Sequence, residues 1–219
     1  MKMTRTNLII GAILALILPL VLQSFGNAWV RIADMALIYV MLALGLNIVV
    51  GFAGPLDLGY VAFFAVGAYT YGLMASPQLT DAFPAIAAMF PEGLHMPLWL
   101  ILPVGAAVAG LFGMLLGAPT LKLRGDYLAI VTLGFGEIIR VFLNNLDHPV
   151  NITNGPKGLN QIDSLKFFGI DLGRPLTIGN FEIASVSLYY YLFLVLVVLS
   201  VVICHRMELS RVGRAWMAI

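Results

Sequence analysis

The chain has 219 residues, of which 61% are hydrophobic and only 11% are charged, and its net charge is +1. A soluble domain carries about 25% charged and about 45–50% apolar residues, so the composition excludes a soluble fold. The small net charge and thinly spread basic residues also argue against nucleic acid or a strongly acidic molecule as a partner. The composition therefore indicates an integral membrane protein embedded in a lipid bilayer.

Several kinds of chemistry are not predicted from this sequence. A single cysteine, Cys204, excludes an intrachain disulfide, and its place at the end of an apolar run suggests inert packing. No cysteine or histidine cluster has metal-ligand spacing, and no G-x-x-x-x-G-K-[ST] loop is present, so we expect no metal, no cofactor and no ATP hydrolysis by this chain. Without a convergent nucleophile, base or metal set, a membrane enzyme is not expected either.

Six apolar segments approach the roughly 20 residues that a helix needs to cross a bilayer. They predict an all-α fold, a polytopic transmembrane helical bundle with Gly/Pro-broken segments, in a single domain spanning residues 1–219. The first segment could instead be a signal peptide, because basic residues precede it and Ser-Phe-Gly follows, but the later spans favour an uncleaved helix. The predicted spans are Leu8–Leu22, Ile32–Val50, Leu58–Ala75, Leu98–Leu116, Tyr127–Leu146 and Ile183–Cys204.

The distribution of lysine and arginine predicts a cytoplasmic N-terminus, because short cytoplasmic segments are enriched in these residues. With that orientation, residues 76–97 and 147–182 are long outer connections. The prolines in residues 76–97 exclude one continuous helix there. Both connections are expected either to join spans or to meet an external partner.

Small residues recur at four-residue spacing on the fourth span, at Gly105, Ala109, Gly113 and Gly117. On a helix they form a narrow ridge that another helix can approach closely. Packing within this chain and a subunit interface are both compatible with such a ridge.

Between the second and third spans, "GFAGPLDLG" at residues 51–59 interrupts the helical pattern beside the charged Asp57. Irregular backbone at membrane depth is tolerated where it is buried in protein or faces water, and transporters use broken helices in this way. A short cytoplasmic turn is the competing interpretation.

On the fifth span, one helical face is formed by residues at three- to four-residue steps, and it carries the polar side chains of Glu137, Arg140 and Asn144. The positions are Gly134, Glu137, Arg140 or Val141, and Asn144. A charge at mid-membrane costs roughly 2.5–3.5 kcal/mol, which pairing between positions i and i+3 offsets in part. We expect this face to look onto other helices or a water-filled path. A structural salt bridge, a path-lining or gating pair, and a proton relay remain open, and Asn47 is a weaker candidate of the same kind.

Four stretches resemble the permease subunits of bacterial branched-chain amino acid ABC uptake systems. The loop "NITNGPKGL" is similar to the family's T-G-G-P-x-G-I loop, with Asn154 in place of the first glycine of its pair. The "LRGDY" within residues 121–145 resembles the form found in the M subunit. The four stretches are residues 44–69, 121–145, 151–159 and 210–219.

The resemblance implies a permease that works with a sister permease subunit, two cytoplasmic ATPase subunits and a periplasmic substrate-binding protein. It implies uptake of branched-chain or related amino acids across the bacterial cytoplasmic (inner) membrane, by alternating access driven by ATP hydrolysis on the separate ATPase subunits. The residues expected to line or gate the path are Asn47, Asp57, Glu137, Arg140 and Asn144.

The resemblance also concerns the C-terminal residues of the chain. Arg211, Gly213 and Arg214 are similar to the approach to the family's ATPase-coupling segment. Family members continue past the position of Ile219, so we expect the sequence to be a fragment or a truncated product. An ion-coupled secondary transporter or a channel for a small solute is the alternative function, and it would leave this segment without a role.

Overall fold

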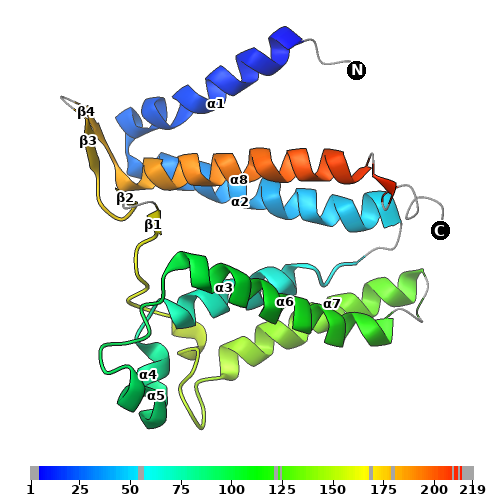
Figure 1. Cartoon of the computed structure of the whole chain (residues 1–219). Helices are drawn as coiled ribbons and strands as arrows, with labels where there is room; N and C mark the ends of the chain where they lie inside the picture. The colour runs from blue at the N-terminus through cyan, green and yellow to red at the C-terminus, as the bar shows by residue number, and fades with distance from the viewer. Residues whose placement is uncertain are drawn as a thin grey trace. The chain divides into compact units, whose positions relative to one another are not determined.

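A computed structural model of the chain describes residues 5–53, 57–120, 123, 125–167, 170–178, 181–208, 210, 211 and 213. Its helices gather into two compact units, each of which is described by itself (Figure 1). The first unit comprises Met1–Ile48 and Gly169–Ile219, and the second comprises Val49–Phe168. The single permease domain proposed for residues 1–219 stays a prediction.

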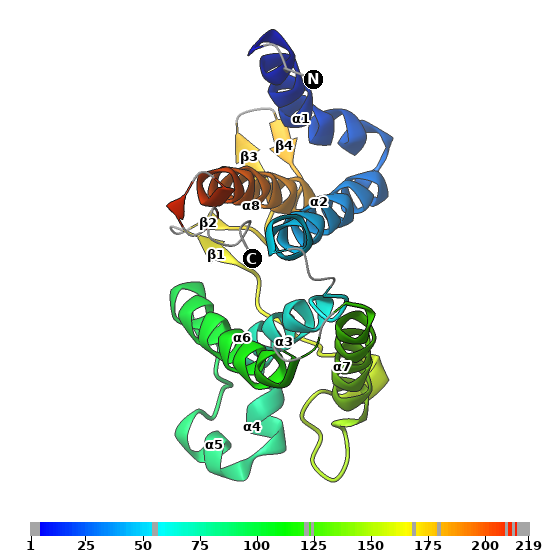
Figure 2. The ribbon, with the colours of Figure 1, turned by 90° about the vertical axis from the view of Figure 1, so that its right-hand side faces the viewer.

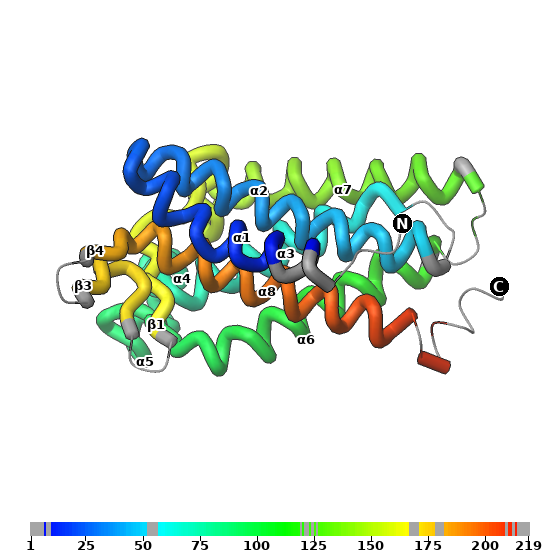
Figure 3. Tube along the Cα trace, turned by 90° about the horizontal axis from the view of Figure 1, so that it is seen from above, coloured from blue at the N-terminus to red at the C-terminus, as the bar shows by residue number. Residues whose placement is uncertain are grey.

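Three helices build the first unit: α1 (Arg5–Phe25), α2 (Asn27–Asn47) and α8 (Ser185–Glu208). Gly26 separates α1 from α2 with a φ of 121°, a conformation that glycine adopts readily and other residues rarely do. Helices α2 and α8 lie side by side and run in the same direction (Figure 1). Helix α1 packs against both and lies on the near side of them in the view of Figure 3.

Polar contacts join α1 to α8 in this unit. The Ser187 hydroxyl donates to Gln23 Oε1 at 3.0 Å, and the Tyr190 hydroxyl donates to the Ala15 carbonyl oxygen at 3.1 Å. Ser187 and Tyr190 are buried, whereas large apolar side chains such as Leu14 and Val198 are exposed. Apolar side chains on the outside and satisfied polar groups inside are what a bilayer requires of a helical protein.

Short strands in the second long connection depart from the purely helical expectation. Strands β3 and β4 pair antiparallel, with Thr177 opposite Glu182, and the Gln23 side chain donates to the Glu182 carbonyl oxygen at 3.1 Å. Because each strand has only two or three residues, the predicted all-α class is confirmed. The strands are β1 (Lys166–Phe167), β2 (Ile170–Asp171), β3 (Leu176–Ile178) and β4 (Phe181–Ile183).

In the second unit, α3 (Val61–Met74) lies between α6 (Leu98–Thr120) and α7 (Asp126–Asn145), as Figure 2 shows. The short π-helix η1 (Ile48–Ala53) follows α2 along the chain. The core of this unit consists of residues from all three helices: Ala62, Val66, Val108, Phe112, Leu116, Ile139 and Leu143.

The connection between α3 and α6 contains two short helices, α4 (Gln78–Ala82) and α5 (Pro84–Met89). The expectation that no continuous helix forms there is confirmed. The connection after α7, which contains the 3₁₀ turn η2 (Gly155–Lys157), comes back to the same end of the unit. There the Gln78 side chain donates to the Asn151 carbonyl oxygen at 3.0 Å.

Each of the six predicted spans contains a helix in the described part of the chain, although the helix of the third span begins at Val61 and that of the sixth at Ser185, after Ile183 at the end of β4. Four of them are long and apolar enough to cross a membrane, namely Asn27–Gly51, Leu98–Ala118, Tyr127–Asn145 and Ser185–Glu208. The described apolar parts of the other two, Ile10–Phe25 and Val61–Met74, are shorter. The expected polytopic helical membrane protein is confirmed.

Candidate functional site

The two ionic side chains of the fifth predicted span pair with each other on α7. Arg140 Nε donates to Glu137 Oε2 at 2.9 Å, and Arg140 Nη2 donates to Glu137 Oε1 at 2.5 Å. Such a two-bonded fork between guanidinium and carboxylate is the strong form of an ion pair. Both side chains are nevertheless exposed, at 67% for Arg140 and 57% for Glu137.

This ion pair lies at the rim of an apolar groove between α3 and α7. The groove has a volume of about 360 Å³. Its polar side chains are few, so it offers mostly apolar surface with charge concentrated on one helix. Residues from both helices and the turn before α3 line it: Leu58, Val61, Ala62, Ala65, Tyr69, Leu133, Gly136, Glu137, Ile139, Arg140, Leu143 and Asn144.

The groove exists because α3 and α7 run in the same direction and touch near their starts. Gly59 lies against Thr132 at that end, and Tyr69 and Asn144 line the groove further along both helices. Asn144 is half-buried there, as expected for a residue of the same face. The structure thus brings Glu137, Arg140 and Asn144 together around one groove.

Asp57 and Asn47 lie elsewhere among the described residues. Asp57 Oδ1 accepts a hydrogen bond from the Gly59 N–H at 2.9 Å, so the carboxylate stabilises the turn that leads into α3. Asn47 is the exposed last residue of α2, directly before η1. Gly54 and Pro55, the centre of the predicted break, lie outside the described residues.

A close approach of the turn before α3 to helix α7 was not predicted. A Cβ on Gly59 would clash with the Thr132 carbonyl oxygen, and a Cβ on Gly136 would stand 3.6 Å from Gly59 Cα. The Leu58 N–H also donates to Thr132 Oγ1 at 3.1 Å. The small residues Thr132 and Gly136, four positions apart on α7, were the available signal.

Gly134 makes no close helix contact in the structure. Among the described residues, a Cβ there would meet no atom within 4 Å, and Gly134 is exposed. The close contact on this helix involves Gly136, two residues further along.

The ridge of small residues on α6 is mostly open. Among the described residues, only Gly113 of its glycines would bring a Cβ within 4 Å of another residue, at 3.9 Å from Phe63 Cε1, whereas Gly105 and Gly117 would meet none of them. Helix α6 contacts the core through Val108, Phe112 and Leu116, one position before Ala109, Gly113 and Gly117. The use of this ridge, within the chain or against a partner, stays a prediction.

Asp34 is a membrane-level carboxylate that the sequence pattern did not single out. It lies on α2, is only 8% exposed, and its Oδ1 has no hydrogen-bond partner among the described residues. The signal was a lone acidic residue in "RIADMALIYV", the same pattern that drew attention to Glu137. Ionisable groups inside membrane spans are functional candidates by default.

At the C-terminal end of the described chain, Gly213 is buried, and its N–H donates to Ser210 Oγ at 3.1 Å. A Cβ on Gly213 would clash with the Met207 carbonyl oxygen. Arg211 is exposed, and Arg214 lies outside the described residues.

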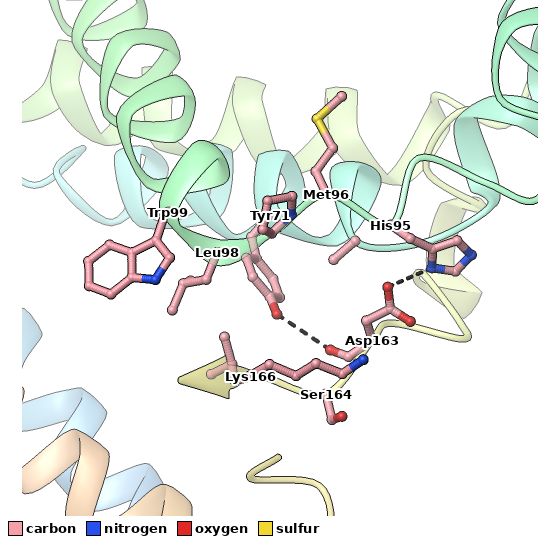
Figure 4. A pocket seen from close by; sticks show the side chains of 11 residues that line it. Tyr71, His95, Met96, Leu98, Trp99, Asp163, Ser164 and Lys166 are labelled. Atoms are coloured by element: carbon pink, nitrogen blue, oxygen red, sulfur yellow. Dashed lines mark hydrogen bonds and ion pairs between the residues drawn. The ribbon is translucent and has the colours of Figure 1, made fainter. Parts of the chain in front are cut away.

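A second cavity lies where the two long connections of the second unit meet. It has a volume of about 300 Å³ and is lined by the end of α3, the start of α6 and residues 163–166 (Figure 4). His95 Nδ1 contacts Asp163 Oδ2 at 2.5 Å, and this hydrogen bond raises the pKa of His95 above its usual value. Burial, which lowers the pKa of His95, is a smaller effect.

Apolar surface around every spanning helix, with an ion pair and a buried carboxylate at membrane level, defines a multi-pass α-helical membrane protein. Comparison with known proteins narrows this class. Residues 28–219 match the family described as branched-chain amino acid transport system / permease component, and the chain belongs to this family.

Two relatives share one name, high-affinity branched-chain amino acid transport system permease protein LivM. One comes from Salmonella typhimurium (strain LT2) and the other from Escherichia coli (strain K12), and each is 40% identical over 202 residues. These alignments cover 87% of this chain and 43% of each relative, so the chain spans less than half of their length. No solved structure matches the chain.

Proposed function

We propose that this chain is the M-type permease subunit of an ATP-driven uptake transporter for branched-chain or related amino acids. The observation that carries the proposal is the 40% identity, over 87% of the chain, to two proteins named as permeases of branched-chain amino acid transport. The membrane is the bacterial cytoplasmic membrane, and the N-terminus is on its cytoplasmic side.

The partners in this proposal are a sister permease subunit, two cytoplasmic ATPase subunits and a periplasmic substrate-binding protein. The exposure of Glu137 and Arg140 in the unit that carries them supports a protein partner, because lipid is a poor surrounding for a charged pair. In this proposal a neighbouring permease subunit covers the groove and keeps the charged pair away from lipid.

The groove between α3 and α7 is the proposed part of the path. Its apolar walls suit an aliphatic side chain, and the paired charges of Glu137 and Arg140 present both signs at one rim. A zwitterionic amino acid exchanges hydrogen bonds with such a pair without leaving an unpaired ion behind. Movement of α7 against α3, driven by the ATPases, opens the groove to one side and then to the other.

Transport measurements on the complete assembled transporter test the proposal. Proteoliposomes with ATP at the ATPase subunits and binding protein outside should accumulate radiolabelled L-leucine. The double variant Glu137→Gln with Arg140→Met should lose most of this uptake, because the groove loses both charges. The matched control is Asp171→Asn with Arg174→Met, which removes another i, i+3 pair outside the spanning helices.

Each result has a distinct meaning. Unchanged uptake by the Glu137/Arg140 double variant would contradict the path role of the pair. Uptake driven by an ion gradient or by voltage, without any nucleotide, would contradict the ATP-driven class and favour a secondary transporter or channel.

A further inference from the structure

The cavity at the meeting of the two long connections has a fixed shape that its own hydrogen bonds maintain. The Asp163 N–H donates to the Ala75 carbonyl oxygen at 2.8 Å, and the Met96 N–H donates to the Met74 carbonyl oxygen at 3.1 Å. The Tyr71 hydroxyl donates to the Asp163 carbonyl oxygen at 3.4 Å. Backbone and side chains thus tie the end of α3 to both connections, and a preformed pocket of this kind is typical of small-molecule sites.

Charge and apolar surface are separated within this cavity. Figure 4 shows the Lys166 ammonium and the Asp163 carboxylate at one end, and the Trp99 ring and Leu98 at the other. A volume of about 300 Å³ is at the lower limit of about 300–1,000 Å³ for ligand pockets, so the ligand is small.

His95 holds the Asp163 carboxylate in place. His95 Nδ1 contacts Asp163 Oδ2, and His95 Nε2 contacts the Glu92 carbonyl oxygen at 2.8 Å. Because a carboxylate and a carbonyl both accept hydrogen bonds, the ring satisfies both contacts when both of its nitrogens are protonated. Asp163 keeps a second carboxylate oxygen for other donors.

The cavity also contains Lys166, whose ammonium group has no ion-pair partner among the described residues. An ammonium group in a pocket that also holds apolar surface attracts an anionic group attached to an apolar body. The neighbouring carboxylate attracts a cationic group on the same small molecule.

We propose that this cavity is a binding site for a zwitterionic amino acid with an apolar side chain. Lys166 binds the α-carboxylate, Asp163 binds the α-ammonium group, and Trp99 and Leu98 contact the side chain. The inference rests on the proposed function, since it takes the transported class of solute as the ligand. It adds a second binding position that is separate from the groove between α3 and α7.

Direct binding to the membrane subunits tests this site without transport. The complete chain, assembled with its sister permease in lipid nanodiscs and kept free of binding protein and nucleotide, is titrated with radiolabelled L-leucine. Lys166→Met should weaken binding about tenfold or more, because a hydrogen bond to a charged group is lost. Lys166→Arg should retain binding, and Lys157→Met, an exposed lysine of the same connection, should have no effect.

Half-ligands provide a second measurement. Two competitors are used: 4-methylpentanoate lacks the ammonium group, and 3-methylbutylamine lacks the carboxylate. Each should need a concentration about tenfold or more higher than unlabelled L-leucine to displace the radiolabelled L-leucine. Asp163→Asn should remove the advantage of L-leucine over 4-methylpentanoate.

Equal leucine binding by wild type and Lys166→Met overturns the site, even if ATP-driven uptake is normal. Loss of uptake in Lys166→Met with unchanged leucine binding overturns it as well and assigns the surface to a protein partner. Lys166-dependent leucine binding in an assembly that performs no ATP-driven uptake supports the site and contradicts the proposed function instead.

Discussion

Gly59, in the turn before α3, lies so close to the backbone of α7 that no side chain can be added without moving the turn or the helix. The contact joins a turn, stabilised by Asp57, to the buried Thr132. A sequence pattern shows that a glycine is present, but it does not show which helix that glycine faces. The pairing of Gly59 with Thr132 therefore could not be predicted, although a break near residues 51–59 could.

Gly59→Ala should lower the free energy of unfolding by about 1–3 kcal/mol, as overpacking against fixed backbone does. Thermal unfolding of the detergent-solubilised chain measures this. Gly134→Ala is the matched control, because its Cβ meets no atom and alanine favours a helix over glycine by up to ~1 kcal/mol. Equal effects of the two substitutions would contradict the close approach.

Asp34 differs from Gly59. An acidic residue inside an apolar span is visible in the sequence, but only the structure shows that Asp34 is buried. Its Oδ1 accepts no hydrogen bond from the described residues, and burying a polar atom in this way costs about 1–3 kcal/mol. Asp34→Leu should therefore raise the unfolding temperature of the isolated chain, whereas the exposed Asp81→Leu should not. A lower unfolding temperature for Asp34→Leu would mean that the carboxylate is stabilised in the membrane.

At the scale of elements, the six spans could be predicted because long apolar runs have few alternatives in a bilayer. The β3–β4 hairpin was not predicted, since strands of three residues leave almost no periodic pattern. Its one signal was the Gly-Asn dipeptide between "LTI" and "FEI", which is typical of two-residue hairpin turns. The apolar groove could not be predicted from the sequence either, because it depends on how α3 packs against α7.

The contact between the two long connections should depend on pH through His95. The pKa of His95 is raised in the folded chain, chiefly by its hydrogen bond to Asp163, so the folded state holds the proton more tightly than the unfolded state does. The stability contributed by the contact is complete below the unfolded pKa of about 6.5 and is lost as the pH rises through the raised value.

Unfolding temperatures of the solubilised chain between pH 5 and pH 9 measure this dependence, with the pH range set by the usual histidine pKa of about 6.5. Wild type should lose stability across the upper part of that range. His95→Gln should remove this component of the slope and leave the rest of the curve in place. The same slope in wild type and variant would show that the contact does not hold the connections together.

At the scale of the whole molecule, the amino-acid sequence by itself indicated the family, through long motifs in the right order. The pairing of Glu137 with Arg140 was an open question that the geometry of α7 answers. The surroundings of the pair could not be predicted, because in the proposed assembly they depend on helices of other chains. The exposure of the pair in its own unit is the observation from which a covering partner is inferred.

The accessibility of the groove to water in the assembled transporter most directly tests whether solute passes along α3 and α7. Leu133 lines the groove and is 57% exposed, whereas Ile138 lies on the same helix outside the groove and is 61% exposed. In a Cys204→Ser background, Leu133→Cys should react with a charged, membrane-impermeant thiol reagent at a rate that changes with ATP. Ile138→Cys should not react. Equal reactivity at the two positions, or no reaction at Leu133→Cys in any nucleotide state, would contradict a path along these two helices.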